Sequence, residues 1–66
     1  MYVLPVLEDG GVRTTEPSHV LDMDHIPPPG TVLQLADLRQ MWRIDETVYV
    51  IARDRLVRVD LYCEQM

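Results

Sequence analysis

The stretch that decides the fold of this protein runs from Met41 to Tyr62 and reads MWRIDETVYVIARDRLVRVDLY. Apolar, mostly β-branched residues alternate with polar ones along it, and this period of two predicts half-buried strands. Charged residues interrupt the alternation at Asp45 and Glu46 and again over residues 52–55. We therefore expect three short strands separated by two charged turns.

The same alternation assigns side chains to the two faces of the predicted sheet. The face expected to point into the core carries Trp42, Ile44, Val48, Val50, Val57, Val59 and Leu61. Neither predicted turn contains Gly or Asn, so both are expected to be built around type I turns in loops longer than two residues.

The rest of the chain divides into two further parts. Residues 1–16 predict a hairpin, with a strand over residues 2–7, a turn at Gly10 and Gly11, and a return strand over residues 12–15. Residues 17–30 form an acidic, proline-rich connection in which Pro27 to Gly30 is a stiff spacer. Residues 31–62 then form a β meander, which begins with an extended run over residues 31–35 and one helical turn near residues 37–41.

The sequence thus predicts a single, mainly β domain over residues 1–66, an antiparallel sheet of five or six short strands. In architecture alone it resembles the small SH3-like barrels, and fold by itself does not imply function. A rival interpretation is a helix over residues 47–59, because several of their apolar side chains also match a helical stripe. That helix would make the chain a winged-helix DNA-binding regulator with Arg53, Arg55 and Arg58 facing the DNA. The β-branched and aromatic residues 47–51 favour strands instead.

Composition narrows the classes of partner. The net charge is −5, and residues 1–30 hold five carboxylates against one arginine. A negative chain is repelled by phosphate, which argues against a general affinity for nucleic acid. The apolar run at residues 2–7 is too short for a membrane span and lacks the basic start of a signal peptide, so we expect a cytoplasmic protein.

A chain of 66 residues builds only a thin core. Cys63 is the single cysteine, so no internal disulfide can reinforce this core, and we expect the thiol to be a small buried apolar group. We therefore expect a homodimer or an obligate complex with a protein partner.

Candidate sites for chemistry are few. His19, Asp22, Asp24 and His25 carry metal-binding atoms within seven residues, and a metal-binding module through His19, Asp22 and His25 is one alternative function. Their spacing matches no established ligand pattern, and no nucleophile or phosphate-binding loop accompanies them. We therefore predict no catalytic residue, no bound metal and no cofactor.

The predicted outward face of the C-terminal sheet is the better candidate for function. It would present Arg43, Tyr49, Arg58 and Tyr62, and Tyr and Arg are the residue types in which binding energy concentrates. The acidic first half, around Asp22 and Asp24, offers a second surface for a basic partner. The sequence therefore predicts a small, acidic, non-enzymatic module that binds a protein, in the manner of phage-encoded inhibitors and modulators of host proteins.

Overall fold

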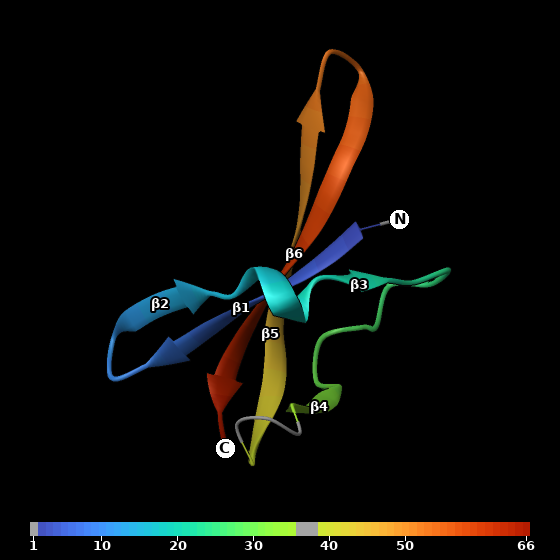
Figure 1. Ribbon diagram of the computed structural model, residues 1–66. Helices are drawn as coiled ribbons and strands as arrows, with labels where there is room; N and C mark the ends of the chain where they lie inside the picture. The colour runs from blue at the N-terminus through green and yellow to red at the C-terminus, as the bar shows by residue number, and fades with distance from the viewer. Residues whose placement is uncertain (1, 36–38) are drawn as a thin grey trace.

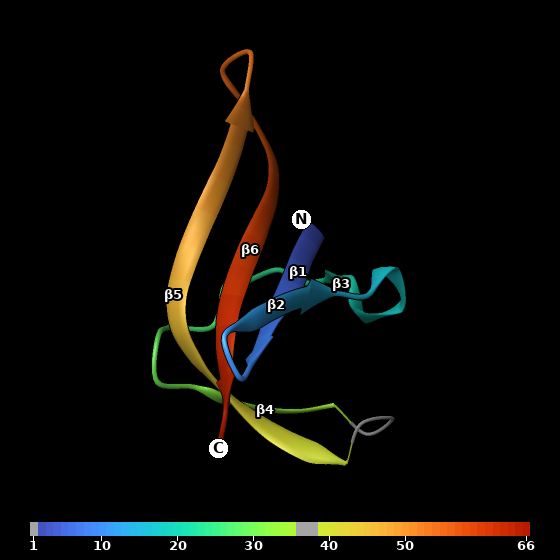
Figure 2. The same cartoon turned by 90° about the vertical axis from the view of Figure 1, so that its left-hand side faces the viewer.

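Strands make up nearly all of the regular structure in the computed structural model, which describes residues 2–35 and 39–66. The elements in chain order are β1 (Tyr2–Asp9), β2 (Val12–Thr15), the 3-10 turn η1 (Pro17–His19), β3 (Leu21–Asp22), β4 (Val32–Leu35), β5 (Gln40–Ala52) and β6 (Arg55–Gln65). They form one sheet that curls into a half-barrel (Figures 1 and 2). The prediction of a small, mainly β, barrel-like fold of five or six strands is confirmed.

The strand order β2-β1-β6-β5-β4 places the first and last strands of the chain side by side. β1 and β6 run parallel, from the pair Val3 and Val59 to the pair Glu8 and Glu64. The other pairings are antiparallel, and β3 joins the edge of β1 beyond the end of β2. The parallel pair was not predicted, because parallel strands need a long crossover that local sequence does not announce. Here that crossover includes all the other elements.

The prediction of a charged turn at Asp45 and Glu46 is wrong. β5 runs unbroken through both residues, and its pairing with β6 shifts there, with Ile44 opposite Cys63 and Glu46 opposite Tyr62. Asp45 is therefore the extra residue of a β-bulge, which leaves one residue without a cross-strand partner and bends the strand. Two long strands replace the three short ones expected.

The second predicted turn is also shorter than expected. Ala52 lies opposite Arg55, so the loop contains only Arg53 and Asp54, with φ angles of 53° and 62°. Positive φ at both central residues is typical of a type I′ turn, whose twist matches that of the flanking strands. Gly10 and Gly11 form a two-residue turn of the same kind between β1 and β2, with φ angles of 60° and 83°. The strong twist of the strands therefore selects the same turn type with and without glycine.

The segment that leads from β3 to β4 ends in a tight turn over residues 28–31, directly before β4 begins. Thr31 donates its N–H to the carbonyl of Pro28, so Pro29 and Gly30 occupy the centre of this turn. Gly30 then donates to the carbonyl of Ile44 at 2.7 Å, and Ile44 donates to the carbonyl of Thr31 at 2.9 Å. The helical turn predicted near residues 37–41 falls partly on residues 36–38, which lie outside the described residues. Its last two residues are not helical, because β5 begins at Gln40.

The core lies on one face of β1, β5 and β6, here called the core face. Its buried side chains are Val3, Leu7, Trp42, Ile44, Val59, Leu61 and Cys63. Half-buried side chains of the connection and of β4 pack over them: Met23, Ile26, Leu33 and Leu35. The sheet thus curls around a small core that the middle of the chain covers.

The bulge corrects the predicted inner face. Trp42 and Ile44 precede it and are buried as expected. Beyond it, Val48 lies opposite Asp60 and Val50 opposite Arg58, which puts both valines on the outer face of the sheet. The predicted inner position of Val57 is wrong as well, because a second register shift, between Val50 and Ile51, leaves Val57 without a partner in β5, and its side chain is exposed. One extra residue in a strand exchanges the faces of all residues after it.

Candidate functional site: a projecting hairpin arm

The hairpin of β5 and β6 extends well past the rest of the sheet (Figures 1 and 2). The parallel pairing with β1 reaches only as far as Val59, so residues 49–58 have no third strand beside them in the described part of the chain. We call residues 49–58 the arm. Ten residues of hairpin thus depend on each other alone for their backbone hydrogen bonds.

Large apolar side chains remain exposed on the arm. The exposed fractions are 54% for Tyr49, 65% for Ile51, 44% for Leu56 and 49% for Val57. We call these four residues the arm patch. Ile51 lies opposite Leu56, and Tyr49 lies opposite the fully buried Val59, so Tyr49 continues the core face out into solvent. Leu56 shares the core face with Tyr49 and Ile51, whereas Val57 lies beside the outer-face residue Arg58, so the arm patch spans both faces of the hairpin. Exposed apolar side chains gathered on one element of a small protein are typical of an interaction surface.

The outer edge of β5 is open along the same segment. β4 pairs with β5 only from Gln40 to Arg43, and the hydrogen bonds of Gly30 and Thr31 extend this cover as far as Ile44. From Glu46 to Ala52, no strand of the described residues pairs with this edge. An open edge offers unpaired N–H and C=O groups to another strand.

Ion pairs lie on the outer face both at the base of the arm and farther back in the body of the sheet. The Arg58 guanidinium donates two hydrogen bonds to Asp60, the shorter at 2.8 Å, and only 8% of the Asp60 side chain is exposed. Arg43 donates from Nε to Asp45 at 3.0 Å and from its terminal nitrogen to Glu64 at 3.3 Å. The hydrogen bond from Arg43 lowers the pKa of the Asp45 carboxyl group. Both arginines therefore already have carboxylate partners within the chain.

The four residues predicted to share an outward face do not do so. Arg43, Arg58 and Tyr62 lie on the outer face, whereas the bulge turns Tyr49 to the core face. Tyr62 is half-buried, and the Arg13 guanidinium lies over its ring at 4.8 Å from the centroid. Of the four side chains, only Tyr49 is at once exposed and part of the arm patch.

The acidic residues predicted as a second surface lie elsewhere. Asp22 belongs to β3, where it pairs with Tyr2, and Asp24 follows in the connection, with both side chains exposed. His19 is buried, whereas His25 is exposed. Within residues 2–35 and 39–66, no three His, Cys, Asp or Glu side chains are grouped so that they could hold a metal ion.

A pocket that the sequence did not predict lies at the base of the arm. It has a volume of about 360 Å³ and is lined by Tyr2, Leu4, Thr15, Val20, Val57 and Arg58. Its walls come from four separate parts of the chain, so no local pattern could have revealed it. The lining is largely apolar, and Val57 joins it directly to the arm patch.

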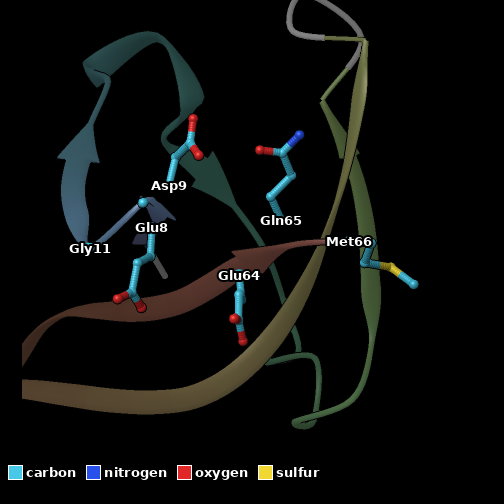
Figure 3. A pocket seen from close by; sticks show the side chains of 7 residues that line it. Glu8, Asp9, Gly11, Glu64, Gln65 and Met66 are labelled. Atoms are coloured by element: carbon cyan, nitrogen blue, oxygen red, sulfur yellow. The ribbon is translucent and has the colours of Figure 1, made fainter.

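Two other hollows lack convergent chemistry. The groove of Figure 3, about 330 Å³ in volume, lies between the β1–β2 turn and the end of β6. Glu8 and Glu64 point to one side of the sheet and Asp9 to the other, so their carboxylates do not converge on one point. The third hollow, of about 290 Å³, lies between Trp42 and the β1–β2 hairpin and includes only one charged residue, Asp9.

Cys63 has the side chain with the greatest nucleophilic capacity in this protein, and its surroundings suppress it. The side chain is buried in the core, and burial raises the pKa of the thiol to about 11. A thiol with this pKa stays protonated at neutral pH and is a poor nucleophile.

No helix in the described part of the chain is both long and apolar enough to cross a membrane. Comparison with protein-family models, curated proteins and solved structures gives no match to this chain.

Proposed function

We propose that this protein is a non-enzymatic module that binds another protein through its β5–β6 arm. The observation that carries the proposal is the arm patch, four large apolar side chains held out in solvent on a hairpin that the rest of the fold does not cover. The net charge of −5 opposes non-specific aggregation of the chain. The exposed apolar surface is therefore better explained as a binding surface for a specific partner.

The pocket at the base of the arm adds an anchoring point. It can take an apolar side chain from a partner that lies along the arm, with Tyr2 and Val57 as its rim. Hot spots of binding are typically a few large side chains in or beside such a pocket. The partner would thus contact both the arm patch and the pocket.

The setting of this activity belongs to the same proposal. We place the protein in the cytoplasm, as a small acidic modulator or inhibitor of a host protein like those encoded by phages and mobile elements. The winged-helix alternative loses its reading helix, because residues 47–52 and 55–59 are strands. The metal-binding alternative has no grouping of ligands in the described residues to support it.

The test replaces the arm patch without touching the core. The double variant Ile51→Ser, Leu56→Ser removes two exposed apolar side chains, and Val12→Ser, with 62% of Val12 exposed on β2, is the matched control. Each tagged protein is used to capture partners from the native host, with mass spectrometry as the readout. We expect a protein that the wild type and the Val12→Ser control retain and that the double variant loses.

A photo-crosslinker gives a second readout at the same two places. Placed at residue 51 it should label the captured protein, and placed at residue 12 it should not. Equal capture by all three proteins, or labelling from residue 12 alone, would move the binding surface away from the arm.

A further inference from the structure

The outer edge of β5 lacks the usual protection of a sheet edge. From Thr47 to Ala52 the sequence reads TVYVIA, without charge, proline or glycine, and no strand of the described residues pairs with it. Natural edge strands are commonly short, charged, bulged or covered, because an open uncharged edge recruits other strands. This one is open over the segment with the highest strand propensity in the chain.

We propose that a second copy of this chain pairs with this edge, so that β5 and the partner's β5 lie antiparallel about a two-fold axis at Tyr49. The proposal rests on the proposed function in that both make the arm the interaction element, but it uses the edge of the arm rather than the side chains of the arm patch. The two half-barrels then share one continuous sheet.

Symmetry restricts where the axis can lie. Directly opposed residues of an antiparallel pair point to the same face, so a two-fold axis perpendicular to the sheet must pass where one residue meets its own copy. With Tyr49 at the axis, Val48 meets the partner's Val50 and Thr47 meets the partner's Ile51. Every position from 47 to 51 then pairs with an uncharged residue.

Charge selects this axis over its neighbours. With Tyr49 at the centre, Glu46 faces the partner's Ala52, while Asp45 in the bulge and Arg53 in the turn lie outside the paired segment. An axis at Val50 brings Glu46 against the partner's Asp54, and an axis at Val48 brings Glu46 against the apolar Val50 of the partner subunit. Of these three axes, only the Tyr49 axis pairs residues 47–51 entirely among themselves, so that no carboxylate is enclosed by the interface or set against another.

Disulfide trapping tests the axis directly. Tyr49→Cys places two thiols across the two-fold axis, where the Cβ atoms of opposed residues lie close enough for a disulfide. The wild type is the background control, because Cys63 is buried with a pKa of about 11, and Val12→Cys reports random collisions of an exposed thiol. Under mild oxidation we expect Tyr49→Cys to form covalent dimer at least about tenfold faster than Val12→Cys.

A mixed pair tests the register further. Thr47→Cys should not crosslink to itself but should crosslink to Ile51→Cys when the two variants are mixed. Light scattering of the untreated wild type across the micromolar range measures its oligomeric state directly, and we expect a dimer.

The outcomes separate this inference from the proposed function. A wild type that stays monomeric across that range overturns the dimer, as does a dimer whose Tyr49→Cys variant crosslinks no faster than Val12→Cys. A monomer that still captures a host protein through the arm patch retains the proposed function and loses this inference. If the dimer is centred on Tyr49 but the Ile51→Ser, Leu56→Ser variant captures the host protein as well as the wild type does, this inference is retained and the proposed function is lost.

Discussion

Strands β5 and β6 run through both the body and the arm of this protein, yet the two regions differ in what covers these strands. In the body, β6 lies between β5 and β1, and residues 23–35 cover its core face, so Val59 is fully buried. Two residues earlier on the same strand, Val57 lies beyond the last pair with β1 and at a register shift opposite β5, and it is 49% exposed. Alternation of apolar residues thus favours a strand, while the burial of its side chains depends on which other segments of the chain pack beside it. The arm is as rich in apolar residues as a core segment, but no other described part of the chain packs over it.

The largest expected effect belongs to the body. Trp42→Ala removes a buried indole beside Ile44 and should lower the free energy of unfolding by ~3–5 kcal/mol, close to the whole stability of a small domain. Leu56→Ala on the arm removes a side chain that is 44% exposed and lies outside the core, and it should cost less than about 1 kcal/mol. Chemical denaturation followed by circular dichroism measures both. Similar losses for the two variants would show that the arm is part of the cooperative core.

A pH effect of intermediate size should come from Cys63. Its pKa is raised from 9.0 to about 11 by burial and, to a lesser extent, by the charge of Asp45, so the folded state keeps the thiol proton that the unfolded state loses. The resulting stabilisation is fully present below pH 9 and disappears as the pH rises toward 11, a loss of roughly 2–3 kcal/mol.

Denaturation of the wild type and of Cys63→Ala at pH 8 and pH 10.5 isolates this effect. The wild type should lose more stability between the two pH values, because tyrosines and other groups contribute equally to both proteins. Parallel losses in the two proteins would mean that the thiol is accessible to water.

The two valines of β6 provide the closest matched comparison of body and arm. Val59→Ala removes two buried methyl groups and should cost about 2 kcal/mol, whereas Val57→Ala should stay within about 0.5 kcal/mol of the wild type. Val59 is paired with Tyr49, whereas Val57 has no partner in β5, so the difference between the two variants reports pairing and cover together. A cost at residue 57 equal to that at residue 59 would indicate that something covers the arm in solution.

The smallest expected effect lies at the tip of the arm. Asp54 has a φ of 62°, a conformation that glycine adopts more readily than other residues, so Asp54→Gly should raise stability by about 0.5–1 kcal/mol. Asp54→Ala should be neutral or destabilising, because Asp tolerates this conformation better than Ala does. Thermal unfolding of the two variants should therefore shift in opposite directions. A gain with alanine would mean that the turn is not held in the type I′ conformation.

Prediction from sequence succeeded where the determining interactions are local. The hairpin at Gly10 and Gly11 and the strand at residues 32–35 follow from turn chemistry and strand propensity. The connection over residues 17–30 was not foreseen to contain the 3-10 turn η1, strand β3 and a turn at Pro29 and Gly30. Trp42 and Ile44 were placed on the core face correctly, because no irregularity precedes them in β5. The prediction of a type I turn at Arg53 and Asp54 failed, because the twist of the two long strands overrode the residues' own preference.

The candidate site was predicted only in part. Tyr49 is on the arm and exposed, as expected, but Arg43 and Arg58 have carboxylate partners in the chain and Tyr62 lies beneath Arg13. The split arises from the bulge, since a single unpaired residue at position 45 reverses the alternation after it. The pocket beside the arm needs residues from β1, β2, the connection and β6, which only the fold brings together.

Local sequence is enough to predict a small β structure with a tight turn at Gly10 and Gly11 and a core around Trp42 and Ile44, because alternation and turn chemistry act between near neighbours in the chain. The parallel pairing of β1 and β6, the bulge at Asp45 and the uncovered residues 49–58 appear only in the folded structure. These features depend on register and on contacts between segments far apart in the chain. The same apolar alternation can therefore belong to the core or to the surface. The outcome depends on whether another part of the chain covers that segment of the strand.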